Sequence, residues 1–72
     1  MEEKILNIMK ETFETEDIDK TCSQENCDKW ESMSHLNLIL SLEEEFDIKI
    51  DPKEISSMKN FNDVVEVVKS KI

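Results

Sequence analysis

A serine and the only histidine of the chain lie three residues apart in the segment KWESMSHLNLILSLEEEF, residues 29–46. Ser32 could act as a nucleophile with His35 as its base, because side chains at positions i and i+3 are neighbours on a helix. A serine hydrolase also needs an orienting group, an oxyanion hole and an enclosed pocket. A short helical chain has little material to build these, so the sequence disfavours catalysis. Ser32 is then either a helix cap or a residue that another enzyme modifies.

Cys22 and Cys27 are the other side chains with distinctive chemistry. Together with His35 they offer three metal-binding groups, fewer than the four ligands of a structural zinc site, and their spacing matches no zinc motif. The sequence begins Met-Glu-Glu-Lys and contains no signal-peptide pattern or long apolar run, which favours a cytoplasmic protein. In that compartment we expect reduced thiols rather than a disulfide.

The composition is strongly acidic, with nine Lys and Arg against eighteen Asp and Glu and a net charge of −9. This balance argues against binding to nucleic acid or to anionic membrane surfaces, and it favours steering toward basic protein partners. High charge with few aromatic residues is also typical of disordered chains. The apolar residues are periodic, however, so we expect a folded domain.

The 72 residues contain no Gly and a single Pro, which suits helices joined by polar loops. We therefore predict one all-α domain over residues 1–72, a small four-helix bundle with three main helices and one short helix. The predicted elements are a helix at about 2–14, a long loop at 15–31, a helix at about 32–46, a short helix at about 52–58 and a last helix at about 61–71.

Apolar spacing predicts the buried face of each main helix. The expected core residues are Ile5, Met9 and Phe13 in the first helix, Met33, Leu36, Ile39, Leu42 (or Leu40) and Phe46 in the second, and Phe61, Val64, Val65, Val68 and Ile72 in the last. Ile18, Cys22 and Trp30 are expected to anchor the loop, and Ile48 and Ile50 to point inward. The predicted capping residues are Ser32 (as N-cap or in the first turn), Asp51 followed by Pro52, and Asn60 with Asp63.

The string WESMSHLNLILSLEEEFDIKI closely resembles the acyl carrier protein family, in which Asp-Ser-Leu is followed by a helix that ends in Leu-Glu-Glu-Glu-Phe-Gly-Ile. The resemblance extends over the whole order of helices and loops. It implies that Ser32 is the residue esterified by 4′-phosphopantetheine, which a phosphopantetheinyl transferase takes from coenzyme A with magnesium. The arm would then carry an acyl or aminoacyl group as a thioester between a loading ligase and downstream transferases or synthases. The carrier itself would be a monomer and not an enzyme.

The same resemblance assigns the partner surface. It places Glu31 and Met33 on the docking surface for the transferase, and it matches Glu43, Glu44 and Glu45 to the acidic end of the recognition helix. Met33 is also a member of the expected core stripe, so its place on the surface or in the core is left open. We expect His35 to be a solvated residue near the arm or a partner contact.

Several residues depart from the family pattern. Glu-Ser-Met replaces Asp-Ser-Leu, and Lys29-Trp30 stands where fatty-acid carriers usually have Gly-Ala and peptidyl carriers a glycine pair. Ser34 and Asn37 occupy positions that are often acidic in fatty-acid carriers. These departures favour a stand-alone carrier of a specialised pathway, with partner choice residing in Trp30, Met33, Ser34 and Asn37. A carrier of primary fatty-acid synthesis and an unmodified acidic docking module remain the alternatives.

Overall fold

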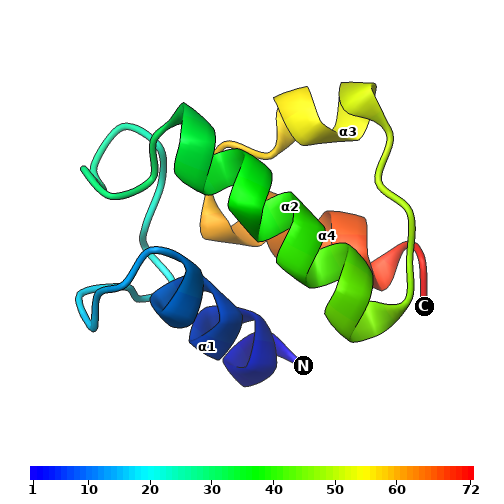
Figure 1. Ribbon diagram of the computed structural model, residues 1–72, viewed down its shortest axis with the longest axis horizontal. Helices are drawn as coiled ribbons and strands as arrows, with labels where there is room; N and C mark the ends of the chain where they lie inside the picture. Colours follow the sequence, from blue (N-terminus) through cyan, green and yellow to red (C-terminus); the bar gives the residue numbers. More distant parts are fainter.

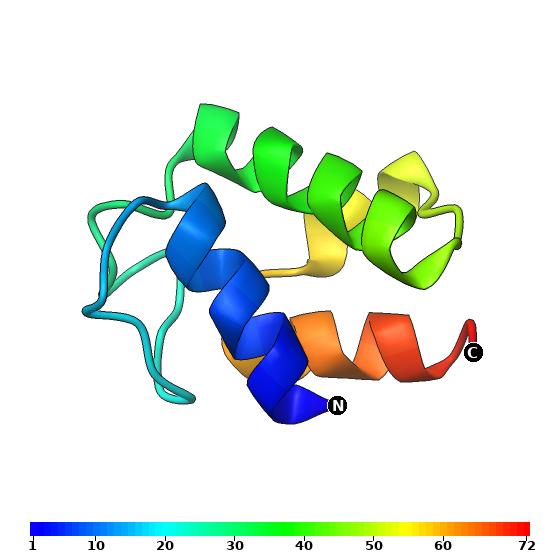
Figure 2. The same ribbon diagram turned by 60° about the horizontal axis from the view of Figure 1, so that its bottom comes forward.

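The computed structural model describes all residues from 1 to 72 and contains four helices. They are α1 (Glu2–Thr12), α2 (Ser32–Phe46), α3 (Pro52–Ser57) and α4 (Phe61–Lys69). In Figure 1, α2 crosses the front of the molecule with α4 behind it, α1 lies along one side and the short α3 along the other. Figure 2 shows α2 and α4 as separate layers, with α1 slanting across them. The predicted all-α fold of three main helices and one short helix is confirmed.

One hydrophobic core holds the helices together. The fully buried side chains come from every long helix and include Ile5, Met9, Leu38, Leu42 and Val64. The loop anchors are confirmed as well, because Ile18, Cys22 and Trp30 are buried in the same core. Ile50 is also buried and Ile48 packs against the core, as the alternating segment after α2 predicts. Cys27 is a fourth anchor of the loop, which the sequence did not predict.

The caps of the two C-terminal helices are those that the sequence predicts. Asp51 caps α3 with Pro52 in its first turn, and the Glu54 carboxylate completes a capping box by accepting the Asp51 N–H at 3.0 Å. The side-chain oxygen of Asn60 accepts the N–H of Asp63 at 2.8 Å at the start of α4. These contacts satisfy backbone donors that a helix start would otherwise leave free.

Three helices end earlier than the sequence suggests. α1 ends at Thr12 instead of residue 14, because Phe13 turns into the core and Glu14 adopts a left-handed backbone with φ 53°. α3 ends at Ser57 instead of 58, and α4 at Lys69 instead of 71. The last residue of the predicted α4 stripe, Ile72, lies beyond this helix and is 63% exposed, so its assignment to the core was wrong.

The long loop between α1 and α2 is tied to the connection between α3 and α4. Ser23 and Asn60 form an isolated antiparallel bridge, the N–H of Gln24 donates to the carbonyl of Lys59 at 2.8 Å, and the N–H of Phe61 donates to the carbonyl of Cys22 at 3.0 Å. Backbone bonds across this distance in sequence fix the path of a segment that has no regular structure of its own. The loop therefore leads the chain to the start of α2 along a defined path.

Candidate functional site

Ser32 is the first residue of α2 and is exposed. Of the two placements predicted for it, the first-turn placement is right and the N-cap placement is wrong, because Glu31 is the N-cap residue. Glu31 makes no side-chain capping bond, and the first turn contains no acidic residue. The backbone N–H groups at this end therefore point toward solvent without a side-chain acceptor, beside an accessible hydroxyl.

His35 is buried, with 7% of its surface exposed, so the expectation of a solvated residue or a partner contact was wrong. The indole N–H of Trp30 donates to His35 Nδ1 at 3.0 Å, and His35 Nε2 lies 2.8 Å from the carbonyl oxygen of Ile55. Since both ring nitrogens already have partners within the fold, His35 is not positioned as a base for Ser32. This arrangement does not support the serine-hydrolase interpretation.

Trp30 is also buried, at 2% exposure, and its ring packs on that of Phe13 with 5.6 Å between centroids. A residue this enclosed cannot contact a partner protein directly. At Trp30, where the sequence departs from the family pattern, the polar contact of the side chain is therefore internal, with His35.

The outer face of α2 carries an exposed apolar stripe, which we define as Met33, Leu36 and Leu40. Their exposed fractions are 71%, 56% and 63%, respectively. The open question about Met33 is thus settled in favour of the surface, and the expected burial of Leu36 was wrong. The helix buries His35, Leu38, Ile39 and Leu42 instead.

Two open cavities lie at the start of α2, and Ser32 lines one of them. One, of about 480 Å³, lies between the loop and α2 and is lined by Gln24, Trp30, Glu31, Ser32, His35 and Leu36. The other, of about 530 Å³, lies on the α1 side of the helix start, and its lining includes Met33, Ser34 and Asn37. Ser34 is half-buried and Asn37 is exposed. Both residues line this second cavity together with Met33.

The three glutamates near the end of α2 differ in their contacts. Glu43 is half-buried, and its Oε2 accepts the backbone N–H of Ile50 at 2.9 Å, which fixes the segment after the helix. Glu45 pairs with Lys4 of α1 at 3.1 Å. Glu44 is exposed and is in none of the three ion pairs of the structure, so its carboxylate is free to meet a partner without losing an internal ion pair.

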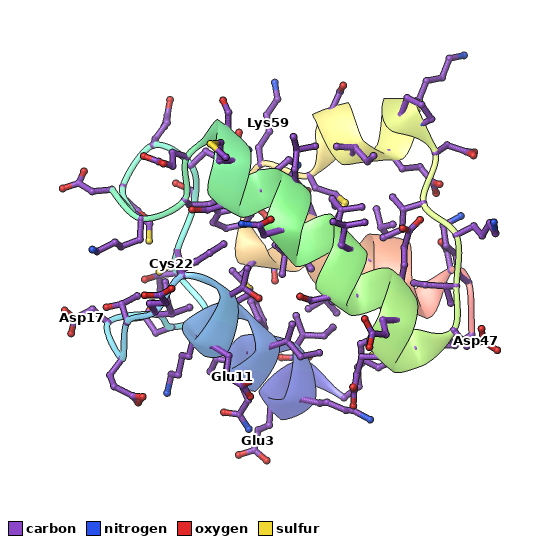
Figure 3. All side chains as sticks on the ribbon, viewed as in Figure 1. Glu3, Glu11, Asp17, Cys22, Asp47 and Lys59 are labelled. Atoms are coloured by element: carbon purple, nitrogen blue, oxygen red, sulfur yellow. The ribbon has the colours of Figure 1, made fainter.

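The wider surface is rich in carboxylates. Figure 3 shows the side chains of Glu3, Glu11 and Asp17 pointing away from the protein along α1 and the beginning of the loop, and Asp47 lies at the end of α2. With a net charge of −9, most of these acids have no cation beside them. Such a surface attracts basic partners over a distance of about a Debye length.

Both cysteines are free and buried. Burial raises the pKa of the Cys22 thiol, and the neighbouring Cys27 thiol adds to this effect, while the backbone N–H of Asp19 opposes it. No group of three or more His, Cys, Asp and Glu side chains is arranged to hold a metal ion. None of the four helices combines the length and apolar character needed to cross a bilayer.

A search against protein-family models gives no match for this sequence, and no curated protein matches it. Among solved structures, the chain is similar to the holo acyl carrier protein from Geobacter metallireducens, determined in solution by NMR. The two share 32% sequence identity and superimpose with a TM-score of 0.87. The match covers 97% of this chain and 83% of the Geobacter chain. The chain therefore belongs to the acyl carrier protein family.

Proposed function

We propose that this protein carries acyl or aminoacyl groups on a 4′-phosphopantetheine arm that a separate transferase attaches to Ser32. The observation that carries the proposal is the position of Ser32 in a member of this family: an exposed hydroxyl at the first residue of α2, with no catalytic base beside it. In the transfer, the Ser32 oxygen would form a bond to the phosphorus of the phosphopantetheine unit of coenzyme A. The diphosphate bond would break, the adenosine bisphosphate would leave, and the hydroxyl proton would pass to the transferase.

The residues around Ser32 fit such a group. The uncapped N–H groups of the first turn of α2 and the positive end of its helix dipole would hold a phosphodiester. The cavity that Ser32 lines leaves the side chain open to an enzyme and leaves room for the first atoms of a flexible arm. The arm supplies the terminal thiol for the thioester, and the chain itself needs only to present the serine and the surface around it.

The apolar stripe and the acids beside it form the proposed partner surface. Met33 follows the modified serine directly and is the most exposed large apolar side chain of the protein. Leu36 and Leu40 extend the apolar contact along the helix, and Asn37 lies between them in sequence. Glu31 at the helix start and Glu44 toward its end would meet basic side chains. Glu43 and Glu45 would contribute charge while keeping their internal contacts.

A specialised pathway is the second part of the proposal. Ser34 and Asn37 are uncharged, so no acidic side chain lies between Glu31 and Glu43 on α2. The first three turns of the helix therefore present apolar and neutral polar groups, and the negative charge is concentrated at the far end. Partners with an apolar contact near the arm and a basic contact farther along would fit this distribution best. A loading ligase and downstream transferases or synthases are the enzyme classes expected to use it.

Intact-mass measurement tests the proposed modification. The protein is incubated with coenzyme A, magnesium and a broad-specificity phosphopantetheinyl transferase, beside Ser32→Ala and the matched control Ser34→Ala. We expect one added phosphopantetheine group on the wild type and on Ser34→Ala, and none on Ser32→Ala. An unmodified wild type would favour an acidic docking module instead, and Ser32-dependent hydrolysis of activated esters without transferase would favour an enzyme.

A further inference from the structure

The two cysteines of the chain have no part in the proposed function, and both lie in the loop between α1 and α2. Cys22 and Cys27 are free thiols buried in the hydrophobic core, with 7% and 9% of their surfaces exposed. The Cys27 thiol is close enough to the Cys22 thiol to raise its pKa. The fold therefore holds a pair of neighbouring thiols rather than two isolated ones.

A tight turn brings the two cysteines together. The side-chain oxygen of Asn26 accepts the Ser23 N–H at 2.9 Å, and its side-chain nitrogen donates to the Thr21 carbonyl at 2.9 Å. The Cys27 N–H donates to the Ser23 carbonyl at 3.0 Å and closes the turn. Because these bonds fix the backbone between Cys22 and Cys27, the closeness of the two thiols is a property of the folded loop.

The surroundings of the two thiols differ. Cys27 lines an open cavity of about 250 Å³ beside Lys29. Cys22 is bound within the loop, since its sulfur accepts the Asp19 N–H at 3.4 Å and its thiol donates to the Asp17 carbonyl at 3.9 Å. A small molecule can therefore reach Cys27 from solvent, and Cys22 is placed to react with Cys27 afterwards.

The loop around this pair contains much like charge and no regular structure. Between residues 16 and 28 there are five exposed acids and a single lysine; the acids are Glu16, Asp17, Asp19, Glu25 and Asp28. Repulsion between like charges favours local opening of such a segment. A covalent bond between two of its residues removes many of the conformations of the open loop, and it thereby stabilises the closed one.

We propose that Cys22 and Cys27 form a reversible disulfide that holds the loop in its folded arrangement, with a low-molecular-weight disulfide such as glutathione disulfide as the oxidant. The proposal does not depend on the modification of Ser32, and its test needs no transferase. It makes the loop that leads to Ser32 more resistant to opening under oxidising conditions.

The reaction is two successive thiol–disulfide exchanges. In the first, the Cys27 thiol loses its proton and its sulfur attacks glutathione disulfide; a Cys27–glutathione bond forms, and one glutathione leaves and takes up the proton. In the second, the Cys22 thiol loses its proton and its sulfur attacks the sulfur of Cys27. The bond between Cys22 and Cys27 forms, and the second glutathione leaves with that proton. Two protein thiols are oxidised, and one glutathione disulfide is reduced to two thiols.

Mass spectrometry of the folded wild-type protein tests the product. After incubation with glutathione disulfide, remaining thiols are blocked, and cleavage after Lys20 and Lys29 releases a peptide that contains both cysteines. We expect this peptide to have lost two hydrogen atoms and to carry no glutathione. A lasting glutathione adduct, a disulfide between two copies of the chain, or thiols that do not react would each overturn the proposal.

The stabilising effect of the bond is measured on the same protein. At a fixed ratio of glutathione to glutathione disulfide, we expect the ratio of disulfide to dithiol to be at least about tenfold higher in the folded protein than in concentrated urea. For the same reason the oxidised protein should unfold at a Tm at least about 5 °C above that of the reduced protein. An equal or lower ratio in the folded protein, or an equal or lower Tm, would overturn the proposal.

Two matched variants test the order of the steps. Cys22→Ala keeps the thiol beside the cavity, and its glutathione adduct on Cys27 should persist because no second thiol displaces the glutathione. Cys27→Ala keeps only the thiol bound within the loop, and its adduct should form at least about tenfold more slowly. Equal rates for the two variants would contradict the entry through Cys27. The wild-type measurements stand without these variants if either fails to fold.

Discussion

At the scale of single residues, the functional segment contains two polar side chains with opposite roles. Ser32 is exposed at the helix start, whereas His35 is buried with both ring nitrogens occupied. A spacing of three residues would suit a nucleophile and its base, but both ring nitrogens of His35 contact groups inside the fold. The chemistry at Ser32 is therefore expected to come from another protein.

The pH dependence of stability can be predicted at Glu54. The hydrogen bond from Lys71, followed by the bond from the Asp51 N–H, lowers the pKa of Glu54 below its usual value of 4.5. A lowered carboxyl pKa in the folded state stabilises the fold above the unfolded-state value, and this contribution is lost as the pH falls through the folded-state pKa. Glu54→Gln can still accept the Asp51 N–H but cannot pair with Lys71.

We expect Glu54→Gln to lower the Tm by up to about 5 °C at neutral pH, because an ion pair that solvent still reaches contributes little. The difference between wild type and variant should disappear below the folded-state pKa, where Glu54 is protonated. Thermal unfolding followed by circular dichroism across acidic and neutral pH measures this. A difference that stays constant down to strongly acidic pH would contradict the assignment.

The sequence could not predict the burial of His35. A histidine between Ser34 and Leu36 gives no local signal, because its burial depends on Trp30 and on a carbonyl twenty residues farther along the chain. Ser32, in contrast, is proposed as the modified residue from the residues around it, and the structure confirms only its place in the first turn of α2. Prediction succeeded for the caps at Asp51 and Asn60, which neighbours in sequence define, and failed for His35, whose place depends on distant contacts.

At the scale of secondary-structure elements, α2 is the helix with two apolar faces. Leu38, Ile39 and Leu42 face the core, and Met33, Leu36 and Leu40 face solvent. Periodicity alone could not separate these faces, because apolar residues fill so many positions between Met33 and Leu42 that more than one helical stripe fits them. The C-terminal end of α1 could not be predicted either, since the turn at Glu14 depends on Phe13 entering the core.

The exposed face of α2 leads to a prediction about partner binding. Leu36→Ala should lower the kcat/KM of the transferase for the carrier by about fivefold or more, since truncation of an apolar contact at the centre of an interface commonly has an effect of this size. The helical circular dichroism spectrum should not change, because Leu36 is 56% exposed. The rate of modification at several carrier concentrations measures the effect.

Ile72→Ala is the matched control for Leu36→Ala. Ile72 is an aliphatic residue of similar exposure, at 63%, but lies at the C-terminus of the chain. It should leave the rate of modification unchanged. Equal rates for wild type and Leu36→Ala would show that the apolar stripe does not contact the transferase.

At the scale of the whole molecule, a small hydrophobic core stabilises a domain whose surface is strongly acidic. A chain of this length gains only about 3–5 kcal/mol of net stability from one hydrophobic core. The carboxylates that attract partners also repel one another, so each buried side chain has a large share in keeping the domain folded. We therefore expect substitutions of core residues to lower the free energy of unfolding much more than substitutions on the exposed faces.

A pair of leucines on α2 tests this difference. Leu38→Ala removes a fully buried side chain and should cost roughly 2–5 kcal/mol, enough to leave a large fraction of the protein unfolded. Leu40→Ala is the same substitution at a side chain that is 63% exposed, and it should change the free energy of unfolding by less than about 0.5 kcal/mol. Urea denaturation of both variants measures the two values, and similar losses would contradict the assignment of the faces.

The central claim is that Ser32 is the attachment point, and localisation of the added group tests it most directly. After incubation with coenzyme A and transferase, cleavage after Lys29 and Lys49 releases a peptide that contains Ser32, Ser34 and Ser41. Fragment-ion mass spectrometry of this peptide distinguishes the three hydroxyls. We expect one phosphopantetheine group, on Ser32 alone; a group on Ser34 or Ser41, or a peptide that remains unmodified, would contradict the assignment of Ser32.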